Sequence, residues 1–292
     1  MFSIKHTVVK ENLHNTLTKT NFSYIGKKRN TKTLHDVYET RERDKLVWVA
    51  TDRETAFGNR TIASVPFKGQ SMNMVSQWWF EQANDMVDHA VISTPDPRVN
   101  ITRKVQSLSF DVKVCVHGKS SVLVKPVPRW GNRWISAHTL VQDGVLEASE
   151  WDQLFDIATT LFAFGQQTVA PRGLKMVETK YRFGRNTQNR FVLSGGEFHT
   201  PGNTLYWNQD TYEFNLQNGL KPDKWDTDSV RRWVSTHCHD NPHTDKKLPQ
   251  PPDRLVCELA MRYISMYESI TGNLFVPYTN LDLEQLILTE LY

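Results

Sequence analysis

The segment that decides the fold reads Asp36-Val37-Tyr38-Glu39 and resumes as Leu46-Val47-Trp48-Val49-Ala50-Thr51-Asp52-Arg53. Its centre, residues 46–50, is a short apolar run rich in residues that favour strands, which is typical of a buried strand. The polar pair Thr51-Asp52 marks where that strand ends. The stretch from Tyr24 to Asp52 therefore predicts strands joined by a turn.

Beyond this stretch the chain switches between helix and strand patterns. Helices are expected over 71–88, over 149–167 with Ser149 as N-cap, over 226–237, and over 253–271 with Gly272 as C-cap. Strands are expected over 109–124, within 169–181 after a short loop, and over 190–193, with a turn-rich loop at 125–132. Strands first, then a mixed half and terminal helices, predict an α+β fold with two lobes around a cleft.

Composition narrows the class of protein. The 292 residues carry a mild net charge of +3, and the longest basic run is Lys27-Lys28-Arg29, so a nucleic-acid partner is not expected. No apolar run approaches the roughly 18 residues of a membrane-spanning helix, and the first residues lack a signal-peptide pattern, so no membrane partner is expected. Three widely spaced cysteines form no disulfide framework, which favours a cytoplasmic protein.

Six segments, in order, resemble the signature motifs of the SAICAR synthetase (phosphoribosylaminoimidazole-succinocarboxamide synthase) family. They are Asp36–Arg53 (D-[IV]-Y-[ED] then V-A-T-D-R), Pro66–Phe80 (P-x-K-G then S-x-F-W-F), Glu178–Gly184 (D-T-K-[YF]-E-F-G), Glu197–Trp207 (D-E-[IV]-x-T-P-D-S-S-R-[FY]-W), Asp226–Trp233 (D-K-Q-x-x-R-x-W) and Leu255–Gly272, the last helix. The resemblance runs from about Tyr24 to Phe275 and is weakest across 118–150.

The resemblance implies a SAICAR synthetase-like two-lobed fold. A kinase-like antiparallel-sheet ATP lobe would occupy residues 21–110 and a larger mixed lobe with terminal helices 111–275. A peripheral arm (1–20) and a C-terminal tail (276–292) would flank them. It also implies ATP as cofactor and a ligase activity of purine biosynthesis, in which a nucleotide carboxylate is activated as an acyl phosphate and attacked by an amine such as aspartate. Such chemistry ordinarily uses Mg²⁺ on the triphosphate.

The resemblance places several nucleotide-binding candidates. Gly26-Lys27-Lys28-Arg29 matches the family's phosphate-covering G-K-x-R turn, but residues 30–35 are inserted before Asp36, so either Lys27 or Lys32 has the phosphate role. Lys180 matches the family lysine of the ATP site, and Glu178 stands in place of the family aspartate.

Two departures concern the metal and the reaction centre. Arg182 stands where the family has the glutamate of D-T-K-[YF]-E-F-G, and Gly196 stands where it has the aspartate of D-E-[IV]. Glu197 remains, so Glu197 and Glu178 are the metal-ligand candidates, and Mg²⁺ is doubtful because arginine and glycine offer no ligand. The catalytic candidates are Lys180, Arg182 and Glu197.

Other departures affect the substrate. Gly202 and Leu205 replace polar family residues, Thr227 and Asp228 replace a Lys-Gln pair, and the family's R-G-Y-x-x-G-S becomes His117 to Ser121. The substrate-binding candidates are Arg53, Lys68, His117, Asn203, Thr204, Asp226 and Arg231, although Arg53 and Lys68 also suit exposed structural cations. We expect an altered carboxylate or amine substrate. The alternative is an inactive homologue retained as a nucleotide- or protein-binding module, and a homo-oligomer stays open.

A last cluster lies outside the resemblance. His237-Cys238-His239, with His243 four residues on, has the residue types of a metal site, but the adjacent spacing is wrong for a zinc finger. A polar loop after the helix is the stronger interpretation.

Overall fold

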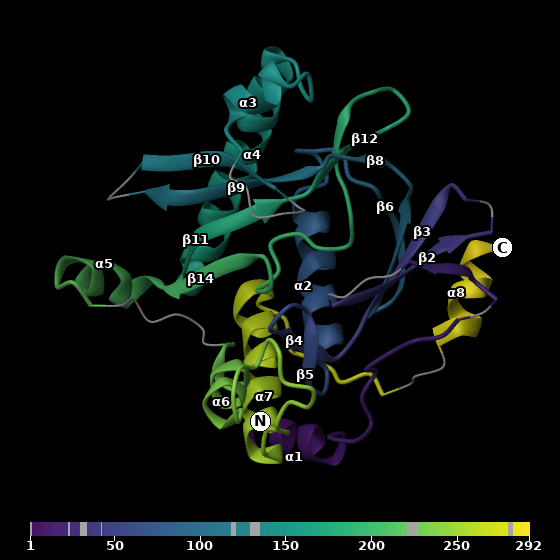
Figure 1. Ribbon diagram of the computed structural model, residues 1–292, viewed down its shortest axis with the longest axis vertical. Coiled ribbons are helices and arrows are strands. Elements are labelled where there is room, and N and C mark those ends of the chain that lie inside the picture. The colour runs from purple at the N-terminus through teal and green to yellow at the C-terminus, as the bar shows by residue number, and fades with distance from the viewer. Residues whose placement is uncertain are drawn as a thin grey trace. The chain divides into compact units, whose positions relative to one another are not determined.

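The computed structural model describes residues 2–22, 24–29, 34–41, 43–117, 121–128, 135–220, 227–279 and 283–292, and has the predicted α+β class (Figure 1). The chain divides into two compact units. The first comprises Met1–Val75, Ile92–Arg103 and Trp225–Tyr292, and the second comprises Ser76–Val91 and Lys104–Lys224. Both units are assembled from separate stretches of sequence, unlike the contiguous lobes 21–110 and 111–275 expected above.

The first unit contains a five-stranded sheet in the order β1-β2-β3-β7-β6. Its strands are β1 (Gly26–Arg29), β2 (His35–Thr40), β3 (Lys45–Ala50), β7 (Val99–Arg103) and β6 (Val91–Asp96), and the hairpin β4 (Arg53–Ala56) and β5 (Arg60–Ser64) lies beside them in sequence. The prediction of a buried strand at 46–50 is confirmed by β3, in which Val47 and Val49 are fully buried.

Helices complete this unit. They are α1 (Phe2–Glu11), the start of α2 (Lys68–Gln82), α6 (Ser229–His237), α7 (Asp253–Thr271) and α8 (Leu283–Leu291). The predicted helix 253–271 is confirmed, because α7 ends at Gly272, whose φ of 76° closes the last turn. The helix expected over 71–88 begins and ends earlier, as α2.

The two segments expected to be peripheral are part of this unit's structure. Residues 1–20 contain α1, which packs against α7. They also contain Leu17, whose backbone O accepts from Asp52 N and whose N–H donates to the Asp52 carboxylate. Residues 276–292 contain α8, whose apolar residues join Ile25, Tyr38 and Val47 in one core cluster. The reason is periodicity: Leu283, Ile287 and Leu291 recur every four residues and form a buried stripe. This corrects the expectation of an arm and a tail.

The second unit is built on a four-stranded sheet in the order β10-β9-β11-β14. Its strands are β10 (Ser121–Pro128), β9 (Phe110–His117), β11 (Leu174–Tyr181) and β14 (Thr204–Asn208). Helix α4 (Ala148–Val169) packs against β9, β10 and β11 (Figure 1). A second sheet has the order β13 (Phe191–Leu193), β12 (Phe183–Arg185) and β8 (Gln106–Ser107). The remaining elements are α3 (Ala137–Gln142), the short 3₁₀ helix η1 (Ala170–Arg172) and α5 (Gln209–Gln217).

Two local expectations in this unit need correction. The N-cap of α4 is Glu147, not Ser149, because Glu147 and Glu150 form a reciprocal capping box. Residues 125–128, expected in a loop, extend strand β10 to Pro128. Proline lacks a backbone N–H, and β10 is an edge strand, where that loss leaves no ladder bond unmade.

A buried aromatic cluster forms the centre of the second unit. His199 is fully buried in it, with its ring 4.7 Å from the ring of Trp79 and its Nε2 2.7 Å from Tyr181 Oη. Burial lowers the pKa of His199 to about 3. A Cβ at Gly165 would lie 2.6 Å from Met176 Cε and 2.8 Å from His199 Cε1, so this packing requires glycine in α4.

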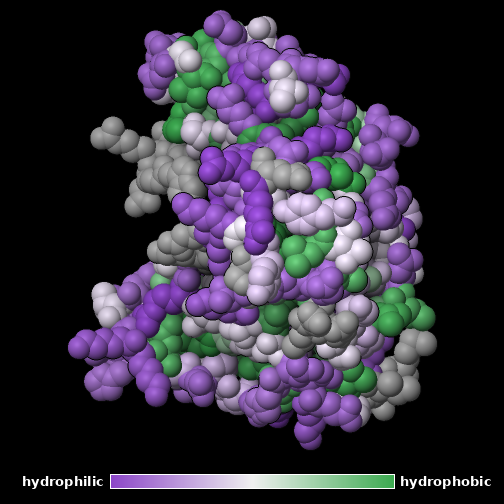
Figure 2. Space-filling model, turned by 90° about the vertical axis from the view of Figure 1, so that its right-hand side faces the viewer, coloured by the Kyte–Doolittle hydropathy of each residue, from purple (hydrophilic) through white to green (hydrophobic). Residues whose placement is uncertain are grey.

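The surface is predominantly hydrophilic on the face drawn in Figure 2, where hydrophobic residues lie in small separate groups. None of the helices in the described ranges combines the length and hydropathy that a bilayer crossing requires.

Candidate functional site

One face of the four-stranded sheet carries three lysines in a single row. Lys113 of β9 lies directly opposite Lys125 of β10 and directly opposite Lys180 of β11. Residues directly opposite in antiparallel strands share a face, so the three side chains extend on the same side of the sheet. The other face is apolar: Val112, Val114 and Tyr181 are buried there. Lys180 itself is exposed.

Two carboxylates accompany these cations. Glu178 Oε2 is 2.5 Å from Lys113 Nζ, and Asp111 Oδ1 is 3.6 Å from Arg182 Nε. Arg182 follows β11 directly, so its side chain lies one position beyond the lysine row. Four cations and two carboxylates are therefore grouped at this part of the sheet, and both carboxylates have a cationic partner.

The turn after Thr200 lies against the end of β11. The Lys180 backbone N–H donates to Asn203 O at 3.2 Å, and the hydroxyls of Thr179 and Thr204 are 2.7 Å apart. Five predicted residues of the second unit are thus brought together: Glu178, Lys180, Arg182, Asn203 and Thr204. Their assigned roles stay predictions.

The segment around Glu197 is held beside the same strand end. Ser194 N donates to Arg182 O at 2.8 Å, and Ser76 Oγ donates to Gly196 O at 2.9 Å. The Ser76 hydroxyl also accepts from Phe198 N at 2.9 Å. Glu197 is half-buried and already engaged within the protein. Hydrogen bonds therefore hold this segment as a loop, and a glycine occupies the position where the family has an aspartate.

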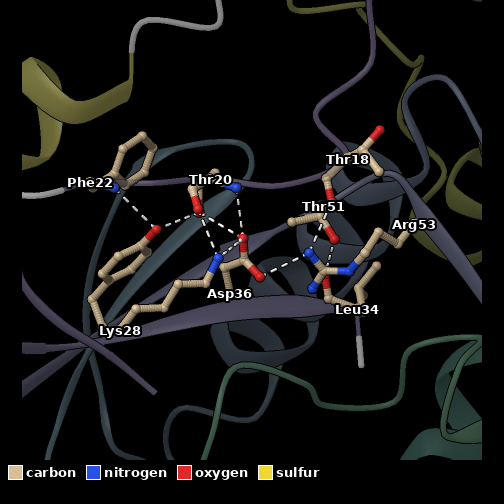
Figure 3. Close-up of polar contacts among 9 residues, drawn as sticks. Thr18, Thr20, Phe22, Lys28, Leu34, Asp36, Thr51 and Arg53 are labelled. Carbon is tan, nitrogen blue, oxygen red and sulfur yellow. Dashed lines mark hydrogen bonds and ion pairs between the residues drawn. The ribbon is translucent and has the colours of Figure 1, made fainter. Parts of the chain in front are cut away.

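In the first unit, the β1–β2 hairpin separates its basic residues onto two sides. Lys27 and Arg29 are exposed, whereas Lys28 points to the Asp36 carboxylate, with Nζ 2.7 Å from Oδ2 (Figure 3). Sequence reasoning missed Lys28, although alternation along a strand places it opposite to its neighbours. Gly26, Lys27 and Arg29 stay candidates for nucleotide binding.

The Asp36 carboxylate is the centre of a buried polar network (Figure 3). Its Oδ2 accepts from Thr20 N at 2.7 Å and from Thr20 Oγ1 at 2.8 Å, and its Oδ1 accepts from Arg53 Nη1 at 2.8 Å. Burial alone would raise the pKa of Asp36, but the hydrogen bonds from Lys28 and Thr20 and the charge of Arg53 outweigh it and lower the pKa. The network ties residues 18–20 to β2.

The cations Arg53 and Lys68 both have internal partners. Arg53 also donates to Thr18 O at 2.9 Å, and Lys68 Nζ lies 2.6 Å from Arg53 O and 2.9 Å from Glu54 Oε2. Both are buried, which favours the structural reading over the substrate-binding one. Arg231, by contrast, is exposed beside Asp228, with its guanidinium 6.0 Å from the ring of Phe57.

Three predicted residues lack a described side chain: Lys32 and Asp226 lie outside the described residues, and His117 is described only as the last residue of β9.

The histidine cluster does not converge. His237 stacks on Trp233, whereas His243 packs against Phe57. His239 is exposed beside Asp240. In the part of the chain that the structure describes, no group of three or more metal-ligating side chains occurs. The interpretation of a polar loop is therefore the better one.

Comparison with known proteins gives a consistent result. A family model described as SAICAR synthetase matches residues 24–120 and 129–248. The phosphoribosylaminoimidazole-succinocarboxamide synthase of Legionella pneumophila (strain Paris) is 33% identical over 90% of this chain and 93% of its own. The chloroplastic synthase of that name from Arabidopsis thaliana is 34% identical over 91% of this chain and 72% of its own.

Solved structures show the same fold. The SAICAR synthase of Saccharomyces cerevisiae complexed with SAICAR superimposes with a TM-score of 0.75 at 19% identity, over 89% of this chain and 99% of that one. A SAICAR synthetase in complex with ADP gives a TM-score of 0.65 at 18% identity, over 86% of this chain and 100% of that one. The predicted fold is confirmed.

Proposed function

Because this chain belongs to the SAICAR synthetase family, we propose that it is an ATP-dependent ligase that forms an amide between a nucleotide-like carboxylate and an amine such as aspartate. One observation carries the proposal: similarity to a named synthase extends over about nine-tenths of both chains. Similarity over this length favours a retained ligase reaction in purine biosynthesis.

The chemistry explains why cations matter in such a site. Transfer of the terminal phosphoryl group of ATP to the carboxylate makes an acyl phosphate, and the amine then attacks that carbonyl carbon while phosphate leaves. Little covalent work falls to the protein in phosphoryl transfer, so it acts by positioning and by neutralising charge. Lys180 and Arg182 are the proposed neutralising groups, and Asn203 and Thr204 are proposed to orient the substrate.

The sheet face does not fit a divalent ion held by its carboxylates. Glu178 is paired with Lys113 and Asp111 with Arg182, so both carboxylates already have a cationic partner. These cations compete with Mg²⁺ for the carboxylates, and glycine at position 196 adds no ligand. We therefore assign no step to a metal bound by this face.

The residues that differ from the family motifs support two more specific proposals. Arg182 with its Asp111 partner, together with Gly196, supports an altered carboxylate or amine substrate. The same features support the alternative, a nucleotide- or protein-binding module without turnover.

Turnover by the purified protein tests the proposal. We expect ADP release that depends on both a carboxylate and an amine, slow with phosphoribosyl-aminoimidazole carboxylate and aspartate, because a site that loses polar partners discriminates strongly against the substrate they served. ADP would be measured by a coupled assay, with each substrate omitted in turn as control.

Two further assays test the altered substrate and the ligase activity separately. Full rescue of a purine-auxotrophic strain lacking its synthase, at low expression, would contradict an altered substrate and leave the ligase intact. Absence of any thermal shift at millimolar ATP, with and without Mg²⁺, would contradict the ligase itself.

A further inference from the structure

We propose that His199 is a positioning residue, which fixes the turn from Thr200 to Thr204 against the end of strand β11 that carries Lys180. The inference deepens the proposed function and rests on it for the ligand, because Asn203 and Thr204 of this turn are proposed to orient the substrate. The position of the turn is measurable without turnover, so the two proposals are tested separately.

Two tyrosine hydroxyl groups from two strands hold His199. Its Nε2 lies 2.7 Å from Tyr181 Oη, and Tyr181 is the last residue of β11 and the neighbour of Lys180. Its backbone O accepts from the hydroxyl group of Tyr206 in β14 at 2.6 Å. All three hydrogen-bonded residues are buried, and a buried polar group that loses its partner costs free energy. These bonds therefore fix His199 relative to both strands.

The backbone conformation of His199 is the second argument. Its φ is 48°, in the left-handed region that residues other than glycine rarely adopt. Such a conformation persists where the surrounding structure imposes it. The His199 ring lies 4.2 Å from the ring of Phe198 and 4.7 Å from that of Trp79, and Gly165 leaves the space that it occupies. The turn therefore begins from a conformation that the buried ring holds.

The residue that follows His199 organises the turn. Thr200 O accepts from Asn203 N at 3.0 Å and from Thr204 N at 2.9 Å. The Asn203 side-chain Oδ1 accepts from Thr200 Oγ1 at 3.3 Å and from Thr204 Oγ1 at 3.0 Å, and Asn203 O accepts from the Lys180 N–H at 3.2 Å. A displacement of Thr200 would therefore move the Asn203 carboxamide away from Lys180.

The role is one of positioning rather than of proton transfer. His199 is fully buried, so its ring does not reach a ligand on the surface of the sheet. Burial lowers the pKa of His199 to about 3 and raises the pKa of Tyr181 well above its ordinary value. Both groups are therefore neutral near neutral pH, and their hydrogen bond acts only by fixing geometry.

Two matched variants of the full chain isolate that hydrogen bond. His199→Gln and His199→Met introduce unbranched side chains of similar length, but only glutamine brings a strong hydrogen-bonding group toward Tyr181. Both lose the imidazole ring, so their difference reports the bond alone. We expect amide hydrogen exchange, followed by NMR, to be about tenfold faster or more in His199→Met than in His199→Gln at three amides of the turn and the strand end: Lys180, Asn203 and Thr204.

An amide elsewhere in the same unit is the internal control. Leu193 N donates to Asp88 O at 2.9 Å, and its exchange should be alike in the two variants. Exchange at Leu193 that rises by the same factor as in the turn would show a general loss of stability and overturn the inference. Equal exchange of the turn amides in the two variants would overturn it as well.

Kinetics connect the turn to the ligand. With phosphoribosyl-aminoimidazole carboxylate as the probe, we expect KM to be about tenfold higher or more in His199→Met than in His199→Gln, and kcat to agree within about twofold. A smaller folded fraction alone would lower kcat and leave KM unchanged, and that result would contradict the inference. The affinity for ATP should be equal in both variants. If the wild type turns over no substrate, the proposed function fails alone, because the exchange comparison still decides whether His199 holds the turn.

Discussion

We expect the protein to lose about 4 kcal/mol of stability through His199 alone as the pH falls from 7 to 3. Burial lowers the pKa of His199 to about 3 in the folded chain, against an ordinary value of 6.5. Below pH 6.5 the His199 side chain therefore binds a proton in the unfolded chain that it does not bind in the folded chain. The stabilising contribution is complete above pH 6.5 and is lost as the pH falls toward the folded value.

The variant His199→Phe isolates this effect. It costs some stability at pH 7, because Tyr181 Oη loses its partner, but the pH slope is the quantity of interest. Urea unfolding at pH 7 and pH 5 should show the wild type losing about 2 kcal/mol more than the variant over that interval. His138→Gln, an exposed histidine in the same unit, should behave like the wild type. Equal slopes for wild type and His199→Phe would contradict the prediction.

Asp36→Ala should cost about 3–5 kcal/mol, because it removes the buried carboxylate that pairs with the buried Arg53 and with the partly exposed Lys28. The Asp36 carboxylate is 2% exposed, and it accepts from Arg53, Lys28 and Thr20. Stabilities of folded domains are about 5–15 kcal/mol, so the variant should be close to unfolding at moderate temperature. Chemical denaturation measures the loss.

A double-mutant cycle identifies the cause. Arg53→Met in the Asp36→Ala background should recover part of the stability, because it removes the buried guanidinium charge that has lost the Asp36 carboxylate, while it keeps most of the side-chain volume. Asp88→Ala breaks the exposed pair with Arg190 and should cost no more than about 1 kcal/mol. A loss at Asp36→Ala no larger than at Asp88→Ala would show that the network in Figure 3 is not what holds residues 18–20 to β2.

Local pattern was enough for much of the fold. The run at 46–50 predicts β3, and the periodic apolar stripe of 253–271 with its terminal glycine predicts α7. Both predictions succeed because burial on one face and a left-handed helix cap depend on a few adjacent residues. The same local matching, motif by motif, was enough to predict the family. It was not enough for residues 276–292, where the apolar stripe is short and did not lead to a helix prediction.

The candidate site was predicted only in part. Glu178, Lys180, Arg182, Asn203 and Thr204 were found by resemblance and lie together in the second unit. Lys113 and Lys125 were not found, because nothing adjacent to them in sequence distinguishes them from ordinary surface lysines. Lys28 was missed although alternation along the strand separates it from Lys27 and Arg29.

The sequence by itself determined elements such as β3 and α7, since alternation, periodicity and caps depend on neighbours along the chain. Only the tertiary structure decided which charged side chains lie next to one another. A strand's alternation says that Lys113 shares a face with Asp111 and Cys115, but not that Lys125 and Lys180 stand beside it. That depends on register, which hydrogen bonds between distant segments set, and a shift of one residue would have turned the lysines of one strand to the opposite face. The same holds for Arg53 of β4, whose contact with Asp36 of β2 joins two different strands and cannot be predicted from its own position.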